Sequence, residues 1–220
     1  MRTYVSPIGY DTRRVTRPVI TTGLSADDTV IMLRPDEESD TDRANRAIAD
    51  VESLLQEIEA AADHTVQRVS TDGFETTIRE CCEVLLSTPD ESETIVSLGG
   101  GARDILLPLT VASLVLSRRV DHALFFSDID QEVRPLSLPN LTARIPERTE
   151  DTFDALVESE GWTTLGEIAE ETGQSKSTVI RHVNDLEEAS VVGSDTSEKA
   201  RRVRISFTGE LLSKAWQEQF

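Results

Sequence analysis

Two glycine-containing segments carry the residue types that bind phosphate groups. The segments, Ser6–Thr12 (SPIGYDT) and Ser97–Arg103 (SLGGGAR), each follow a short apolar run and precede a helical pattern. Glycine lets the backbone approach an anion closely, and the amides that open the following helix point towards it. Arg103, in the first turn of the second helix, can donate a charge-assisted hydrogen bond to phosphate. The residues predicted to line the ligand are Pro7, Ile8, Gly9, Tyr10, Asp11, Thr12, Arg13, Arg17, Ser97, Leu98, Gly99, Gly100, Gly101, Ala102 and Arg103.

The glycine run alone does not identify a cofactor. A dinucleotide-binding fingerprint would need glycine at the position of Asp104, and the Gly-Lys-Ser/Thr of a P-loop is absent. A tight packing turn is the alternative explanation for Gly99–Gly101. Arg13 and Arg17 are equally consistent with a solvated helix face. No cofactor is predicted, and no catalytic residue either, because neither segment holds a histidine or a base–nucleophile pair.

A third segment, Thr164–Phe207, has the pattern of a DNA-binding motif. Apolar residues at helical spacing predict one helix that ends at Gly173, in a left-handed turn, and a second helix capped by Ser175. Over residues 202–207 basic and apolar side chains alternate, which predicts a wing strand paired with Val191–Val192. Such a helix and wing meet phosphates and base edges at a major groove. The side chains assigned to DNA are Ser175, Lys176, Ser177, Thr178, Ile180, Arg181, His182, Asn184, Lys199, Arg201, Arg202 and Arg204. A helical protein-interaction module with a solvated basic strand is the alternative.

The first 145 residues alternate short apolar runs with helical patterns, which is typical of a parallel sheet covered on both faces. Strands are predicted at Thr3–Ile8, Thr29–Leu33, Thr65–Val69, Thr94–Leu98 and Ala123–Phe126, with an antiparallel edge strand at Glu132–Leu136. Helices are predicted at Thr12–Leu24, Asp42–Ala62, Phe74–Ser87, Arg103–Leu116, Thr149–Glu160 and Gly209–Gln219. The predicted fold class is α/β, with a Rossmann-like domain over 1–138, a linker over 139–147 and a winged helix-turn-helix over 148–220.

The charge balance needs an explanation in a chain predicted to bind DNA. The net charge is −19, from 41 acidic and 22 basic residues, of which only three are lysines. Acidic residues are spread through both halves, which favours a proteome adapted to molar salt, where a Debye length of about 3 Å screens distant charges. A mesophilic acidic protein whose wing binds a protein partner is the alternative. Residues 174–206 hold six basic and five acidic residues, so the DNA contacts are predicted there.

The cysteine and histidine content narrows the class of protein. Cys81 and Cys82 are the only cysteines, so a disulfide framework is excluded and a reducing cytoplasm is predicted. No apolar run approaches the roughly 20 residues of a membrane span, and the first residues have no signal-peptide pattern. His64, His122 and His182 have no partner at metal-ligand spacing, so no metal site is predicted.

At residues 175–192, SKSTVIRHVNDLEEASVV, the chain resembles the winged-helix domains of prokaryotic transcription regulators. With SPIGYDT and SLGGGAR included, nearly the whole chain is similar to CRISPR-associated regulators in which a CARF domain is fused to a winged helix. The resemblance implies a homodimer that holds a cyclic oligoadenylate, expected to be cyclic tetra-adenylate, at the two glycine segments. It also implies an archaeal protein, of haloarchaeal type here, that controls CRISPR-related genes in antiviral defence.

Three functions are compatible with this resemblance. The first is a ligand-responsive DNA-binding regulator that is not an enzyme, and this is the one we expect. The second is a ring nuclease that cleaves cyclic oligoadenylate, with Arg103 or Arg13 stabilising the transition state. The third is a regulator whose first domain only dimerises. The helix at 103–116 is apolar all round, which suits a dimer interface, and Pro108 is expected to kink it.

Overall fold

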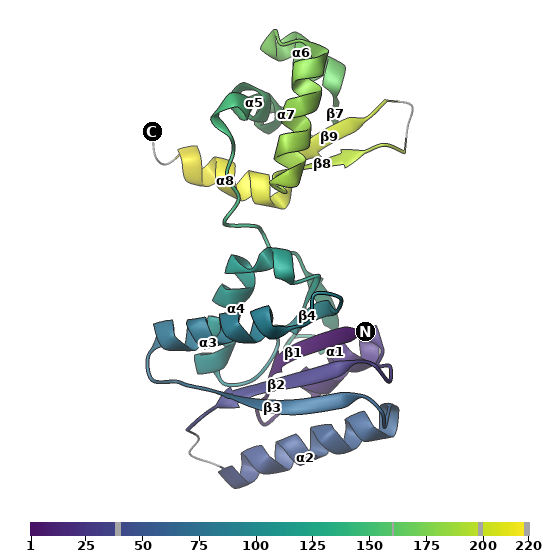
Figure 1. Ribbon diagram of the computed structural model, residues 1–220, viewed down its shortest axis with the longest axis vertical. Coiled ribbons are helices and arrows are strands. Elements are labelled where there is room, and N and C mark those ends of the chain that lie inside the picture. The colour runs from purple at the N-terminus through teal and green to yellow at the C-terminus, as the bar shows by residue number, and fades with distance from the viewer. Residues whose placement is uncertain (38–40, 160, 198–199, 218–220) are drawn as a thin grey trace. The chain divides into compact units, whose positions relative to one another are not determined.

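The computed structural model describes residues 1–37, 41–159, 161–197 and 200–217 of the 220-residue chain. The chain forms two compact units, residues 1–138 and 139–220, each with its own hydrophobic core (Figure 1). Among the described helices, none combines the length and the apolar character that crossing a bilayer requires.

The first unit is built on a six-stranded sheet with the order β3-β2-β1-β4-β5-β6. Its strands are β1 (Arg2–Pro7), β2 (Thr29–Pro35), β3 (Asp63–Val69), β4 (Glu93–Ser97), β5 (His122–Phe126) and β6 (Val133–Leu136). Strands β1 to β5 are parallel, and β6 pairs antiparallel with β5. The predicted Rossmann-like sheet and its antiparallel edge strand are therefore confirmed. The strand order reverses between β1 and β4, which is where open parallel sheets bind ligands.

Helices cover both faces of this sheet. They are α1 (Arg13–Thr22), α2 (Thr41–Ile58), α3 (Phe74–Ser87) and α4 (Arg103–Val115), with a short 3₁₀ turn, η1, at Ser117–Arg119. Alternate residues of β1 face opposite layers, because side chains alternate along a strand. Tyr4 packs with Val15 and Val19 of α1, whereas Val5 packs with Ile105 and other residues of α3 and α4.

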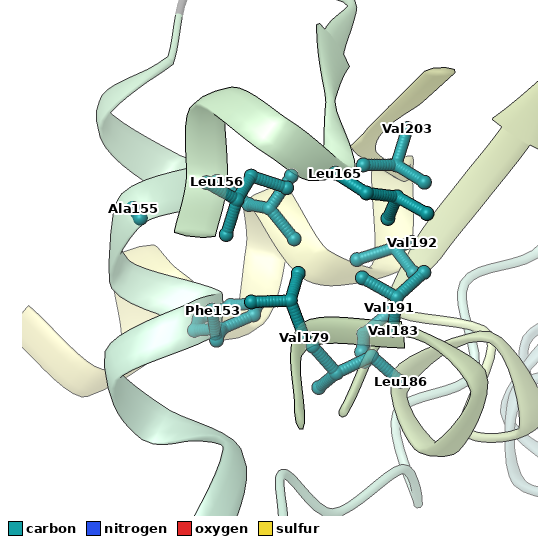
Figure 2. Close-up of a cluster of buried hydrophobic side chains, with 11 residues drawn as sticks. Phe153, Ala155, Leu156, Leu165, Val179, Val183, Leu186, Val191, Val192 and Val203 are labelled. Carbon is teal, nitrogen blue, oxygen red and sulfur yellow. The ribbon is translucent and has the colours of Figure 1, made fainter. Parts of the chain in front are cut away.

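The second unit is a winged helix-turn-helix. Its elements are η2 (Glu147–Thr149), α5 (Glu150–Glu158), β7 (Thr163–Thr164), α6 (Leu165–Thr172), α7 (Lys176–Glu188), β8 (Val192–Asp195), β9 (Arg202–Ile205) and α8 (Phe207–Gln217). Phe153 and Leu156 of α5 pack against Val179 and Leu186 of α7 (Figure 2). All four of these side chains are fully buried, so this core fixes α7 and leaves its opposite face outward.

Several element ends differ from the predictions by a few residues, as at α2, which ends at Ile58 and not at Ala62, and three differences have an identifiable local basis. Helix α1 ends at Thr22 because Gly23, with φ +92°, donates its amide to Val19 and leaves the helical path. Helix α8 begins at Phe207, which was predicted as a strand residue, since Ser206 Oγ accepts the amide of Gly209 and caps the helix. The wing has a third strand, β7, which pairs with β9 to give the order β7-β9-β8.

Candidate functional sites

The two glycine loops of the first unit touch each other beyond the carboxyl ends of β1 and β4. A Cβ added to Gly9 would lie 3.1 Å from the Cα of Gly101. Gly101 itself has φ +83°, and a Cβ there would lie 2.5 Å from the Cβ of Pro7. A side chain at Gly99 would collide with the backbone of Phe126 at 2.4 Å. These contacts explain the three glycines as a close backbone junction, which supports the packing explanation, while an anion site at this place stays a prediction.

Helix α4 begins at this junction without a side-chain cap, whereas at the start of α1 the Oδ1 of Asp11 accepts the amide of Arg13 at 3.3 Å. Thr12 before α1 makes no capping hydrogen bond, and Ala102 before α4 has no side chain that can make one. Among the described residues, none accepts a hydrogen bond from the amides of Gly100, Gly101 or Ala102. Unpaired amides at the start of a helix carry a partial positive charge and bind anions. The first unit therefore offers one such helix start, that of α4, because the first amides of α1 already donate to Asp11 and Thr12.

The predicted ligand residues divide into buried and accessible groups. Pro7, Ile8 and Ser97 are buried, so their side chains pack rather than face a ligand. The amide of Leu98 donates to the carbonyl of Leu124 at 2.7 Å, so this amide is already satisfied. The accessible side chains of the set are Tyr10, Asp11, Thr12, Arg13, Arg17 and Arg103.

Tyr10 lies at the tip of the first loop, with 43% of its surface exposed. The guanidinium of Arg43, on α2, lies 4.1 Å from the centre of the Tyr10 ring. A cation over an aromatic face holds the ring in place while its edge remains accessible. Arg17 and Arg103 are exposed and make no ion pair among the described residues, which suits either a solvated surface or an anion contact.

Arg13 is held by two groups at the start of α1. Its Nε lies 3.0 Å from Asp11 Oδ1, and its Nη1 donates to Gln131 Oε1 at 3.0 Å. The hydrogen bond from Arg13 lowers the pKa of the Asp11 carboxyl below its usual value, so Asp11 is ionised at neutral pH. The predicted loop thus contains a carboxylate that neutralises part of the charge available to an anion.

Arg14 is the functional candidate that sequence reasoning missed. Its Nη1 donates to the carbonyl of Gly99 at 2.6 Å, and its Nη2 lies 2.5 Å from Asp128 Oδ1. The stem of the side chain covers Gly100, where an added Cβ would lie 2.6 Å from the Arg14 Cβ. The spacing along α1 could have identified Arg14: it lies four residues before the buried Pro18, so both residues are on the helix face that is turned to the sheet.

A buried cation lies behind the first loop and was also missed. Arg34, at the end of β2, is only 2% exposed and donates to Asn45 Oδ1 of α2 at 3.1 Å. It lines a small hollow together with Ile8, Gly9 and Ala44. Nothing in the sequence marked this arginine, because a charged residue at a strand end is normally solvated.

In the second unit, local hydrogen bonds set the helix-turn-helix. Thr164 and Glu167 form a reciprocal capping box at the start of α6. Gly173 adopts φ +67° and ends α6 in the left-handed conformation, as predicted. Ser175 then accepts the amide of Thr178 and caps α7. The chain therefore re-enters a helix three residues after leaving one, which is the geometry of a recognition helix.

The outward face of α7 carries most of the side chains predicted to contact DNA. The exposed residues are Ser175, Lys176, Ser177, Ile180, Arg181 and Asn184, and Thr178 is half-buried. Lys176 and Arg181 make no ion pair among the described residues, so their charge is directed outward.

The prediction that His182 faces DNA is wrong. This side chain is 4% exposed, and its Nδ1 lies 2.9 Å from the Oγ1 of Thr152 on α5. Burial lowers the pKa of the imidazole below its usual value, and the nearby Arg181 lowers it further. Residue 182 lies between Val179 and Val183 on the buried face, so helical spacing placed it inward.

The wing arginines are more constrained than their sequence pattern indicated. Arg201 pairs with Glu187 and donates to Asn184 Oδ1 at 2.8 Å, which ties the wing to α7. Arg202 pairs with Asp195 at 3.0 Å. Hydrogen bonds from Ser197 and then from Arg202 lower the pKa of Asp195 to about 2. Arg204 is exposed, and the predicted Lys199 lies outside the described residues.

Trp162, beside the wing, is a residue that the sequence analysis did not predict to contribute to the DNA-binding face. Its ring lies under the guanidinium of Arg204 at 4.6 Å and near that of Arg202 at 5.9 Å. The tryptophan is 40% exposed and directly precedes β7, the strand beside β9. Stacking of this kind restricts an arginine side chain without removing its charge. Trp162 therefore positions Arg204 on the wing.

Comparison with family models identifies both units. A model described as the Csa3 CRISPR-associated Rossmann-like domain matches residues 2–133, which is more than half of the chain. The chain belongs to this family. In this Csa3-family chain, residues 147–196 match the IclR helix-turn-helix domain. The chain thus combines a CRISPR-associated Rossmann-like domain with a helix-turn-helix domain of the IclR type. Among curated proteins, none matches this chain.

Two solved structures resemble the Csa3-family chain at low identity. One is Csm6 from Enterococcus italicus bound to cyclic hexa-2'-fluoro-hexa-dAMP, with 8% identity, a TM-score of 0.48, and coverage of 87% of this chain and 55% of that chain. The other is protein VC1899 from Vibrio cholerae, with 12% identity, a TM-score of 0.43, and coverage of 96% and 64%. This chain spans less than two thirds of either protein.

Cys81 of the Csa3-family chain lies in the core of the first unit. Burial raises the pKa of the Cys81 thiol to about 12, so this thiol is inert at neutral pH. Cys82 is half-buried beside it, and both cysteines are free thiols. Within the described residues, no group of three or more His, Cys, Asp or Glu side chains is placed to hold a metal ion.

Proposed function

We propose that this protein is a homodimeric transcription regulator that binds cyclic tetra-adenylate in its first unit and operator DNA through its second unit. The observation that carries the proposal is the meeting of two glycine loops at the β1/β4 edge, beside the uncapped start of α4 and the unpaired amides of Gly100, Gly101 and Ala102. Free amides there suit phosphate groups. The exposed Lys176 and Arg181 of α7 suit a DNA backbone and base edges.

The outward face of α4 supports the homodimer. Leu107 and Val115 are 53% and 48% exposed, and Leu114 and Val111 of the same helix are partly exposed. Exposed apolar side chains along one helix mark an interaction surface. Since α4 begins at the second glycine loop, a two-fold contact there would bring two copies of the loop towards one symmetric ligand.

The ligand site and the DNA face work together in this proposal. A ligand that binds one arrangement of the dimer more tightly shifts the population towards that arrangement. The spacing of the two recognition helices then changes, and the affinity for operator DNA changes with it. We further propose that the regulated genes are CRISPR-related and that the protein works in a haloarchaeal cytoplasm, because the −19 charge is tolerable for DNA binding where salt screens it.

Isothermal titration of the full chain with cyclic tetra-adenylate tests the ligand part. We expect saturable heat at micromolar protein with one ring bound per two chains. Absence of heat in both low and molar KCl would refute the ligand. If linear oligoadenylate is found in the calorimeter cell after the titration, the protein cleaves the ring, which would instead support the ring-nuclease function. Sedimentation of the ligand-free chain at the same concentration tests the dimer, and a monomer at all concentrations would contradict it.

A further inference from the structure

Arg14 ties three separate segments of the first unit together. It donates to Gly99 in the second glycine loop, its Nε lies 3.5 Å from Asp11 Oδ2 in the first loop, and its Nη2 lies 2.5 Å from Asp128. Its own carbonyl accepts a hydrogen bond from Ser97 Oγ at 3.3 Å. The side chain is 29% exposed, so it lies at the edge of the junction and not inside the core.

Asp128 belongs to the turn between β5 and β6, residues 127–132. The turn is closed internally, because Ser127 donates its amide to the carbonyl of Glu132 and Gln131 donates its amide to Ser127, both at 2.9 Å. Its links to the glycine junction are two, the Asp128–Arg14 pair and the hydrogen bond from Arg13 to Gln131. The turn is therefore a compact third segment of the site, fastened through the arginines of α1.

We propose that Asp128 competes with an anionic ligand for Arg14, so that ligand binding at the glycine loops releases the turn at residues 127–132. This inference rests on the proposed function, since it needs an anion at the junction. The side chain of Asp128 is 70% exposed, so its ion pair with Arg14 is weak. A phosphate group seated on the neighbouring amides pairs with the guanidinium more strongly, through two parallel hydrogen bonds.

Release of this turn would affect the segment that follows it in the sequence. The turn leads into β6, and only Ser137 and Leu138 separate β6 from Pro139, the first residue of the second unit. Strand β6 is an edge strand of four residues whose side chains are largely exposed. A short edge strand is the part of a sheet that shifts most easily. The turn thus connects the pairing of Arg14 with Asp128 to the segment that precedes the helix-turn-helix.

Two neighbouring carboxylates give a matched experiment on the full chain. Asp128 and Glu132 lie in the same turn with side chains that are 70% and 69% exposed. Only Asp128 pairs with Arg14. We would titrate cyclic tetra-adenylate into the wild type, Asp128→Asn and Glu132→Gln, and follow amide hydrogen exchange of residues 127–132 with and without the ligand.

The expected result is that Asp128→Asn binds about two- to fivefold more tightly than the wild type, while Glu132→Gln changes affinity by less than about 1.5-fold. In the wild type the ligand should speed exchange of the turn, and in Asp128→Asn the exchange should already be fast without ligand. Equal gains in both variants would reveal a general charge effect and overturn the inference alone. Slower exchange of the wild-type turn on binding would also overturn it. Failure of all three proteins to bind would overturn the proposed function and the inference with it.

Discussion

In the first unit, Arg13 and Arg14 are both paired with carboxylates, whereas in the second unit Lys176 and Arg181 stand on an exposed helix face without an ion pair among the described residues. To bind an anion, Arg13 and Arg14 would have to exchange a carboxylate partner for it, whereas Arg17 and Arg103 of the same region are exposed and make no ion pair among the described residues. The second unit presents unpaired side chains. Under the proposed function, this difference suits a compact ligand with concentrated charge at the first site and an extended polyanion at the second.

The wing of the second unit contains both ion-paired arginines and an arginine without a carboxylate partner among the contacts described above. Arg201 and Arg202 are paired within the unit, whereas Arg204 is exposed and stacked on Trp162. We therefore assign the paired arginines to the connection between wing and helix. Contact with DNA is assigned to Arg204 together with the α7 side chains.

The largest expected effect tests the backbone character of the first site. Gly101→Ala would place a Cβ 2.5 Å from Pro7 in a left-handed conformation, so the two loops would have to separate. We expect destabilisation on the order of 2–4 kcal/mol in urea unfolding and loss of ligand heat in titration. Gly193→Ala is the control, because a Cβ there meets nothing within 4 Å. Equal behaviour of the two variants would contradict the close junction.

Much of the fold follows from sequence pattern, because alternation and helical spacing depend on local burial. The six strands of the first unit, their parallel direction with one antiparallel edge strand, and the α3 boundaries were predicted, and Gly173 and Ser175 were predicted in their turn and cap roles. The buried position of His182 could have been predicted from its neighbours Val179 and Val183, but the prediction relied on the ability of histidine to contact phosphate. Arg14, Asp128 and Trp162 were not found, since their roles arise from contacts between segments far apart in the sequence.

The next largest effect tests the unpaired face of the second unit. Arg181→Ala should weaken binding to the DNA upstream of the protein's own gene by about 1–3 kcal/mol, since it removes an exposed cation from α7. Lys214→Ala, on α8, removes the same charge from an exposed position away from this helix and should leave affinity unchanged. Fluorescence anisotropy at fixed salt measures both. Equal losses would mean that net charge, and not the α7 face, determines binding.

A smaller effect concerns pH and is confined to the second unit. The pKa of His182 is lower in the folded state than its unfolded value of about 6.5, so the unfolded chain takes up the proton first. The stability contributed by the neutral imidazole is complete above pH 6.5 and is lost as pH falls towards the folded pKa. We expect a loss of at most about 1.4 kcal/mol per pH unit in that window. Urea unfolding at pH 7.5 and 5.5 should show it in the wild type and not in His182→Gln.

The smallest effect sharpens the assignment of the wing. Trp162→Ala should free Arg204 and weaken DNA binding by about 0.5–1 kcal/mol, while Trp162→Phe, which keeps an aromatic face, should lose less. Competition anisotropy resolves differences of this size. If both variants bind DNA with wild-type affinity, stacking on Trp162 does not contribute to DNA binding by Arg204.

The central claim is that a ligand held by the first unit changes DNA binding by the second. The direct measurement is a gel shift of the full chain on its own upstream DNA, with and without saturating cyclic tetra-adenylate, in low and molar KCl. We expect the apparent Kd for DNA to change at least about fivefold on addition of the ligand. An unchanged Kd in a protein that demonstrably binds the ligand would contradict the claim and leave the first unit as a dimerisation domain.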